Sequence, residues 1–236
     1  MGMPEQPTLR SQRVRRWLAH LWREWTIESW RPIAPPFTKP EPLKWNDAQV
    51  TAAWIGHATV LINFFGIRIL TDPVLFPRIG IRLPGFTIGP KRLTAPALQF
   101  HELPRIDLIL LSHAHFDHFD LRTLHRFDEN TRVITAPNTA DLLRWTRLRD
   151  TTELRWGERK IFNIASQTGE IAVSAFQVRH WGARKQRDDY RGYNGYVIES
   201  RGRGKRCVLF AGDTAMTDSF AKLGQPIDLA IMSIGA

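Results

Sequence analysis

The sequence of 236 residues predicts one α/β domain, in which a few helices are inserted among many β-rich segments. Three observations support this class. Apolar residues make up 43% of the chain and charged residues 24%, a balance typical of a globular protein. Short aliphatic runs bounded by glycine, proline and polar residues recur along the chain, as in strands. One of these runs ends in a cluster of histidine and aspartate, where open α/β sheets place their ligands.

Residues 1–31 are expected to form a basic, tryptophan-rich amphipathic helix. Its apolar side chains share one helical face, at Val14, Trp17, Leu18, Leu21 and Trp25. Such a helix lies on an anionic membrane surface through residues 10–31, or it packs its apolar stripe against its own domain. Trp22 and Trp30 lie off the stripe, which slightly favours the membrane. Residues 32–44 contain five prolines and are expected to be an extended connector into a domain of residues 45–236.

The strands expected in this domain are, in chain order, 50–55, 59–65, 67–71, 106–111, 132–136, 171–178, 195–199, 206–211 and 227–234. Gly66 separates the second strand from the third, as in a hairpin. Helices are expected at 120–127, 138–147 and 217–223, and Asn138 or Thr139 is expected to cap the second of them. Residues 74–104 are expected to be a long, unusually apolar loop. It either forms a wall for a lipid-like substrate or packs against the sheet.

Composition restricts the partners and the compartment. The net charge of +10 favours an anionic partner, such as anionic lipid or a phosphate-bearing substrate. Nucleic acid is disfavoured because no nucleic-acid-binding motif accompanies the charge. The sequence has no run of 18 apolar residues and no signal-peptide core, and its single cysteine, Cys207, forms no internal disulfide. A cytoplasmic protein with a peripheral membrane association is therefore expected.

The expected strand 106–111 is followed by a dense group of metal-binding side chains, His113, His115, Asp117 and His118. If the backbone stays extended, the first three project to one side and His118 to the other. Imidazole and carboxylate at this density suit zinc, and the division between two sides suits two ions. His180 and Asp213 each directly follow another expected strand, so both occupy strand exits, as His113 does.

Several further motifs accompany this cluster. They are Trp54-Ile55-Gly56-His57-Ala58-Thr59, Leu70-Thr71-Asp72-Pro73, Gly89-Pro90-Lys91-Arg92, Glu102-Leu103-Pro104-Arg105-Ile106-Asp107, Phe210-Ala211-Gly212-Asp213-Thr214 and Ile234-Gly235-Ala236. From about Trp45 to the last residue, the chain resembles the metallo-β-lactamase-fold hydrolases. Within them it resembles the branch of N-acyl-phosphatidylethanolamine-hydrolysing phospholipase D and its bacterial relatives. The resemblance implies a four-layer αββα sandwich, here truncated in its second half.

The resemblance also implies a set of ligands. His113, His115 and His180 would hold a first zinc ion, Asp117 and His118 would hold a second, and Asp213 would bridge them. The family supplies one more histidine to the second ion from beyond Ile-Gly-Ala, where this chain stops. The chain is therefore expected to be either a fragment or a shortened relative, with a weakened second site. Apolar sheet exposed at the truncation would favour instability or a homodimer.

The activity expected is metal-dependent hydrolysis of a phospholipid-like phosphodiester by a metal-activated water, which Asp117 would also orient. The resemblance places His57 and Asp72 near the metal pocket, as candidates to bind substrate. From the residues alone, His57 is equally well explained as a structural histidine, and Asp72 as the cap of a turn. Arg184, Lys185 and Arg187 are candidates to hold the phosphate. The alternatives are hydrolysis of a lactone or other cyclic ester, and a non-catalytic, membrane-associated binding protein that lacks the last ligand.

Overall fold

The computed structural model describes residues 29–163, 170–185, 187–200 and 205–234, together with the single positions 19, 22 and 26. The apolar stripe predicted at residues 14–25 lies outside the described residues. Among the described helices, none has both the length and the apolar character that crossing a bilayer requires. Residues 32–44 run beside the domain: the amide of Ala34 donates to Leu93 O, and the amide of Ala95 donates to Ala34 O.

The first sheet contains six strands in the order β1-β2-β3-β6-β7-β8. They are β1 (Val50–Gly56), β2 (Thr59–Phe64), β3 (Ile67–Thr71), β6 (Leu108–Leu111), β7 (Arg132–Thr135) and β8 (Thr151–Glu153). Strands β1 to β3 form an antiparallel meander, with the predicted break at Gly66, and β3, β6, β7 and β8 are parallel. Parallel pairing brings the carboxyl ends of β3 and β6 to one edge, where the predicted cluster begins.

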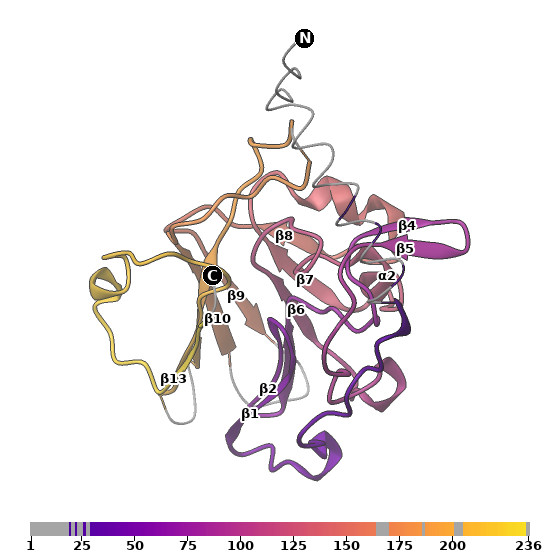
Figure 1. Ribbon diagram of the computed structural model, residues 1–236. Coiled ribbons are helices and arrows are strands. Elements are labelled where there is room, and N and C mark those ends of the chain that lie inside the picture. Colours follow the sequence, from indigo (N-terminus) through magenta and orange to yellow (C-terminus); the bar gives the residue numbers. More distant parts are fainter. Residues whose placement is uncertain are drawn as a thin grey trace, which may run out of the picture.

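The second sheet contains five strands in the order β13-β12-β11-β10-β9. They are β9 (Arg159–Asn163), β10 (Glu170–Phe176), β11 (Gly195–Ser200), β12 (Cys207–Phe210) and β13 (Leu229–Ile231). The pairs are antiparallel except β12 with β13. The two sheets face each other across the molecule (Figure 1). At the β13 edge Met232 and Ile234 are exposed, and the homodimer predicted for an apolar edge stays a prediction.

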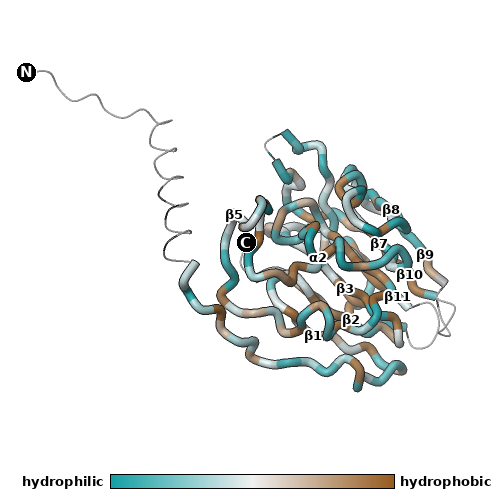
Figure 2. The backbone as a smooth tube through the Cα atoms, turned by 90° about the vertical axis from the view of Figure 1, so that its right-hand side faces the viewer, coloured by the Kyte–Doolittle hydropathy of each residue, from teal (hydrophilic) through white to brown (hydrophobic). Residues whose placement is uncertain are grey.

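The core lies between the sheets because alternate residues of each strand point inward. Ile62 and Leu110 of the first sheet join Val173 and Tyr196 of the second in one buried cluster. Figure 2 shows this apolar interior between more hydrophilic outer segments. The phenol of Tyr196 is fully buried and donates to Leu111 O at 2.8 Å. This hydrogen bond ties the second sheet to the end of β6, immediately before the metal-binding residues.

Short helices and loops cover the outer faces, which completes the predicted four layers. On the first sheet lie η3 (Phe100–Glu102), α2 (Leu121–Leu124) and η4 (Ala140–Trp145); on the second lies η5 (Ala221–Leu223), and η2 (Pro42–Lys44) precedes β1. These helices are shorter than predicted. The segment predicted as a helix over 138–147 is a 3₁₀-helix, and no side chain of Asn138 or Thr139 caps it. Instead, the Glu153 carboxylate accepts from the amides at 138, 139 and 140.

Three strand regions were missing from the sequence prediction. β8 and β9 are short and largely polar, so they lack the aliphatic signal that identified the other strands. The segment 74–104 is not a simple loop, since β4 (Ile81–Leu83) and β5 (Phe86–Ile88) form a hairpin within it. This hairpin projects from the side of the molecule (Figure 1).

Candidate metal centre

Three separated segments meet where strands leave the two sheets. The segment after β6 turns back on itself, because the amides of His118 and Phe119 both donate to His115 O. The backbone therefore does not stay extended there, and the side chains divide differently from the division expected for an extended segment. His180 follows β10 and Asp213 follows β12, and the amide of Ala215 donates to Arg179 O at 2.8 Å. This bond holds the His180 and Asp213 segments side by side.

The first ligand group contains His113, His115 and His180. His113 Nε2 lies 2.8 Å from His115 Nδ1 and 3.2 Å from His180 Nε2, and the last two nitrogens are 3.4 Å apart. Three ligands bound tetrahedrally at 2.0–2.1 Å would be separated by about 3.4 Å. The three nitrogens therefore converge on one point at distances that suit a metal ion.

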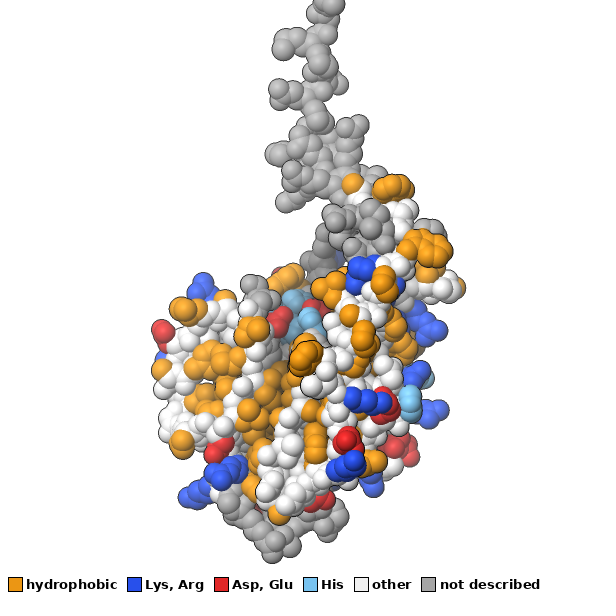
Figure 3. All heavy atoms as spheres, turned by 60° about the horizontal axis from the view of Figure 1, so that its bottom comes forward, with side chains coloured by type: hydrophobic (Ala, Val, Ile, Leu, Met, Phe, Trp, Pro, Cys, Tyr) orange, Lys and Arg blue, Asp and Glu red, His pale blue; other side chains and the backbone are white. Residues whose placement is uncertain are grey.

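The second group contains His57, Asp117 and His118. Asp117 Oδ2 lies 3.1 Å from His57 Nε2 and 3.7 Å from His118 Nε2. On the other side, His118 Nε2 lies 3.1 Å from Asp213 Oδ2. The ring centroids of His113 and His118 are 4.2 Å apart, so the two groups are neighbours. In Figure 3 histidine and acidic side chains gather in one place on the surface, beside apolar side chains.

Asp72 lies behind both groups and fixes two of their histidines. Its carboxylate accepts from the Ser112 amide, from Ser112 Oγ and from His118 Nδ1. Because the single hydroxyl proton of Ser112 goes to Asp72, Ser112 Oγ accepts from His113 Nδ1 at 2.8 Å. Both His113 and His118 are therefore held through Nδ1 and turn Nε2 toward the cluster, an arrangement found behind metal ligands. Asp72 is fully buried behind these histidines, and the hypothesis that it binds substrate stays a prediction.

Charge and burial prepare these groups for a cation. Burial, and then the neighbouring histidines, hold the pKa of His113 well below its usual value. Burial also lowers the pKa of His115 and of His180, so all three imidazoles keep a free lone pair at neutral pH. Burial alone would lower the pKa of His118, but hydrogen bonds with Asp213 and Asp72 raise it to about 10. The second position thus attracts positive charge more strongly than the first.

The predicted substrate cations have different environments. Arg184 donates to Ala114 O and Phe119 O, both at 2.9 Å, and its guanidinium lies 4.0 Å from the Phe116 ring centroid. Burial lowers the pKa of Arg184 to about 10. It holds both ends of the histidine loop, a positioning role that the sequence prediction missed. Lys185 and Arg187 are exposed after His180.

Two further side chains at the site were also missed. Ser112 connects His113 with Asp72, and its place between a strand end and a ligand histidine is the signal that could have identified it. Trp181 is 64% exposed, and its ring lies 4.6 Å from that of His115. It therefore forms an apolar rim beside the first group.

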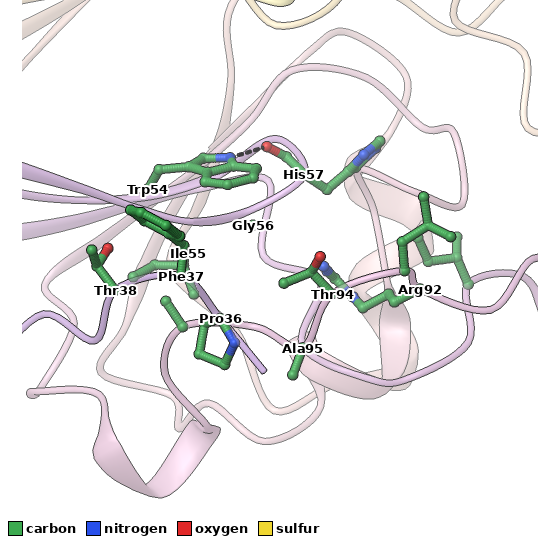
Figure 4. Close-up of a pocket in the computed structure, with 13 residues that line it drawn as sticks. Pro36, Phe37, Thr38, Trp54, Ile55, Gly56, His57, Arg92, Thr94 and Ala95 are labelled. Carbon is green, nitrogen blue, oxygen red and sulfur yellow. Dashed lines mark hydrogen bonds between the residues drawn. The ribbon is translucent and has the colours of Figure 1, made fainter. Parts of the chain in front are cut away.

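A cavity of about 480 Å³ borders His57. Its lining is mainly apolar and comes from the connector, from β1 and from the segment around residue 95. Figure 4 shows Trp54 and Phe37 on one side and Arg92 on the other, with His57 at the border. The Trp54 indole donates to His57 O at 2.6 Å. Cavities of this size commonly hold small molecules.

Comparison with known proteins agrees with this fold and site. The Beta-lactamase superfamily domain matches residues 67–236, so the chain belongs to the beta-lactamase superfamily. Its relatives include N-acyl-phosphatidylethanolamine-hydrolyzing phospholipase D 1 of Caenorhabditis elegans, which is 32% identical over 206 residues, or 81% of this chain and 55% of that protein. An uncharacterized protein of Mycobacterium tuberculosis is 31% identical over 214 residues, or 87% of this chain and 54% of that protein.

Among solved structures, the diiron beta-hydroxylase CmlA from Streptomyces venezuelae is similar, with a TM-score of 0.53 and 27% identity. That match covers 77% of this chain and 34% of CmlA. The chain spans about half the length of the curated relatives it matches. The superfamily is therefore established, the structure contains candidate metal-binding groups, and CmlA shows that a protein of this fold can hold iron.

Proposed function

We propose that this chain is a two-zinc hydrolase that cleaves the phosphodiester of N-acyl-phosphatidylethanolamine-like phospholipids. The observation that carries the proposal is the presence of two adjacent ligand groups, whose His113 and His118 rings are 4.2 Å apart. His113, His115 and His180 would hold the first ion, Asp117 and His118 the second, and Asp213 would lie between them. When bound, such a pair acidifies a water and neutralises charge that develops on an attacked phosphoryl group.

The protein's own side chains prepare the reaction. Burial opposes ionisation of Asp117, but the hydrogen bond from His57 and the charge of His118 lower its pKa below the usual value. Asp117 therefore stays ionised and can accept a hydrogen bond from an attacking water. In this way Asp117 would orient the water and receive a proton from it. Its side chain is 38% exposed, so a substrate can approach it. The exposed cations Lys185 and Arg187 would attract the phosphate.

The apolar cavity beside His57 supports an amphiphilic substrate. Its volume of about 480 Å³ and its apolar lining suit an acyl chain, while the phosphodiester would lie at the ligand groups. The relatives that hydrolyse N-acyl-phosphatidylethanolamine favour the same substrate class. The basic segment 10–31 would bring the protein to an anionic lipid surface.

The test combines elemental analysis of the purified chain with assays on N-acyl-phosphatidylethanolamine vesicles and on a lactone panel. We expect close to two zinc ions per chain and release of N-acylethanolamine, and His115→Ala should remove both zinc at the first position and turnover. Turnover of lactones without any phosphodiester cleavage would contradict the substrate assignment. Vesicle binding without metal or turnover would instead indicate the non-catalytic binding protein.

A further inference from the structure

His57 lies in the turn that joins β1 to β2, and the structure fixes this turn from several sides. His57 itself has a φ of 55°, a region that few residues with a side chain adopt. Gly56 has a φ of 135°, and a Cβ there would lie 3.1 Å from Arg92 Nη1. Arg92 is buried and donates to Phe76 O and Val74 O. The turn therefore holds the imidazole in one place at the edge of the site.

The position of that imidazole is the one a third ligand of the second group would take. His57 Nε2 is 3.1 Å from Asp117 Oδ2, and the ligand atoms of His57, Asp117 and His118 all lie within 4.8 Å of one another. The first group shows similar separations, from 2.8 to 3.4 Å. In the second group, the separations of Asp117 Oδ2 from His57 Nε2 and from His118 Nε2, 3.1 and 3.7 Å, lie near the value of about 3.4 Å expected for ligands around one tetrahedral ion.

His118 supplies a second, independent observation. It is fully buried, and its Nδ1 proton goes to Asp72. Its Nε2 faces Asp213 Oδ2 at 3.1 Å and is otherwise without a hydrogen-bond partner within the described part of the chain. A buried nitrogen that faces a carboxylate is satisfied by a proton or by a cation between the two. Since His57 and Asp117 converge on the same region, a cation there would satisfy all three groups.

We propose that His57 is a metal ligand, and that it completes the second metal position with Asp117 and His118. This inference rests on the proposed function, because it presupposes the two-metal site. The alternative role for His57 is a hydrogen bond to Asp117 from outside the coordination sphere.

The experiment measures metal content and affinity on the 236-residue chain rather than its turnover. Zinc would be counted by elemental analysis after dialysis, and the two positions would be titrated with Co²⁺ by visible absorption. His57→Asn is the main variant, because asparagine tolerates positive φ but supplies no imidazole. We expect bound zinc to fall from about two to about one per chain. The metal affinity of the second position should fall more than about 100-fold, which exceeds the usual effect of losing a residue that only hydrogen-bonds to a ligand.

Two further variants keep the result interpretable. His101→Ala removes an exposed histidine outside the cluster and should leave two zinc ions bound. His57→Gly keeps the turn conformation, and added imidazole should restore the second Co²⁺ signal, which a hydrogen-bonding role would not predict. Two zinc ions bound with unchanged affinity in His57→Asn would overturn this assignment alone. A wild-type chain that binds no metal would overturn both this assignment and the proposed function.

Discussion

The two ligand groups are neighbours, yet they are built in different ways. The first group is the more enclosed: His113 is 1% exposed, His115 and His180 are half-buried, and burial lowers the pKa of all three histidines. The second group is half open, since the side chains of His57 and Asp117 are 40% and 38% exposed. It also carries carboxylates, and it borders the apolar cavity. A buried neutral set favours permanent retention of an ion, while an open charged set favours contact with substrate.

The largest effect should come from removing the centre of the enclosed group. His113→Ala deletes the Nε2 that contacts both His115 and His180, and leaves a buried space behind Ser112. We expect loss of the first metal and a fall in hydrolysis of more than about 100-fold, since losing a ligand exceeds the effect of losing an outer partner. Elemental analysis and initial rates check this, with circular dichroism to confirm folding. Two metals retained by a folded His113→Ala would show that the group is not a ligand set.

Asp72→Asn should weaken both groups together, because Asp72 serves one histidine of each. An amide nitrogen at this position would face a donor, either the Ser112 amide or His118 Nδ1. We expect the affinity of each metal position to fall about 10–100-fold, the range typical of outer partners. Competition with a zinc chelator measures both affinities, and Asp218→Asn, at an exposed position, is the matched control. A loss confined to one position would contradict the shared role.

The two groups should also differ in proton release. The raised pKa of His118 means that it is protonated at neutral pH when no cation is bound, so a metal must displace that proton. The lowered pKa values of the first group mean that its imidazoles are already unprotonated. We expect the metal affinity of the second position to rise about tenfold per pH unit between pH 7 and 9, and that of the first position to change little. Calorimetry in buffers of different ionisation enthalpy would count the protons, and equal release at both positions would contradict this difference.

The enclosed group was the easier of the two to predict from sequence. Aliphatic runs such as 106–111 carry a strong strand signal, and the histidines after β6 and β10 meet where these strands leave the two sheets. The open group depends on features that sequence periodicity does not show. The turn at residues 115–118 brings Asp117 and His118 to one side, and the positive φ of His57 places it opposite Asp117.

The rest of the fold divides in a similar way. Strands with buried aliphatic residues were predicted to within a few residues, whereas the polar strands β8 and β9 and the β4–β5 hairpin were not. The start of η4 depends on Glu153, a residue distant in sequence, so a local capping rule could not identify it. Asp72 was placed near the site by resemblance, but only its contacts with Ser112 and His118 revealed its role.

Ser112→Ala should separate the groups where Asp72→Asn does not. The substitution removes the hydroxyl between His113 and Asp72 and leaves the bond from His118 to Asp72 in place. We expect the metal affinity of the first position to fall about tenfold, because the His113 ring stays enclosed. This is the lower end of the range for residues that hydrogen-bond to a metal ligand. The second affinity should stay within about twofold. The same chelator competition measures both, and an equal loss at the two positions would show that Ser112 acts on the whole loop.

The smallest effect should come from the cavity, which borders the open group alone. Ala95 lines it opposite Trp54, and the backbone of Ala95 is held by its hydrogen bond to Ala34 (Figure 4). Ala95→Phe would fill part of the 480 Å³ while leaving both ligand groups intact. We expect KM for a long-chain substrate to rise about tenfold, the effect of roughly one or two lost methylene contacts, with kcat and zinc content unchanged. A short-chain substrate, and the conservative Ala95→Ser variant, should show little change. If long-chain and short-chain substrates respond equally, the acyl chain lies elsewhere, and the openness of the second group serves the phosphodiester alone.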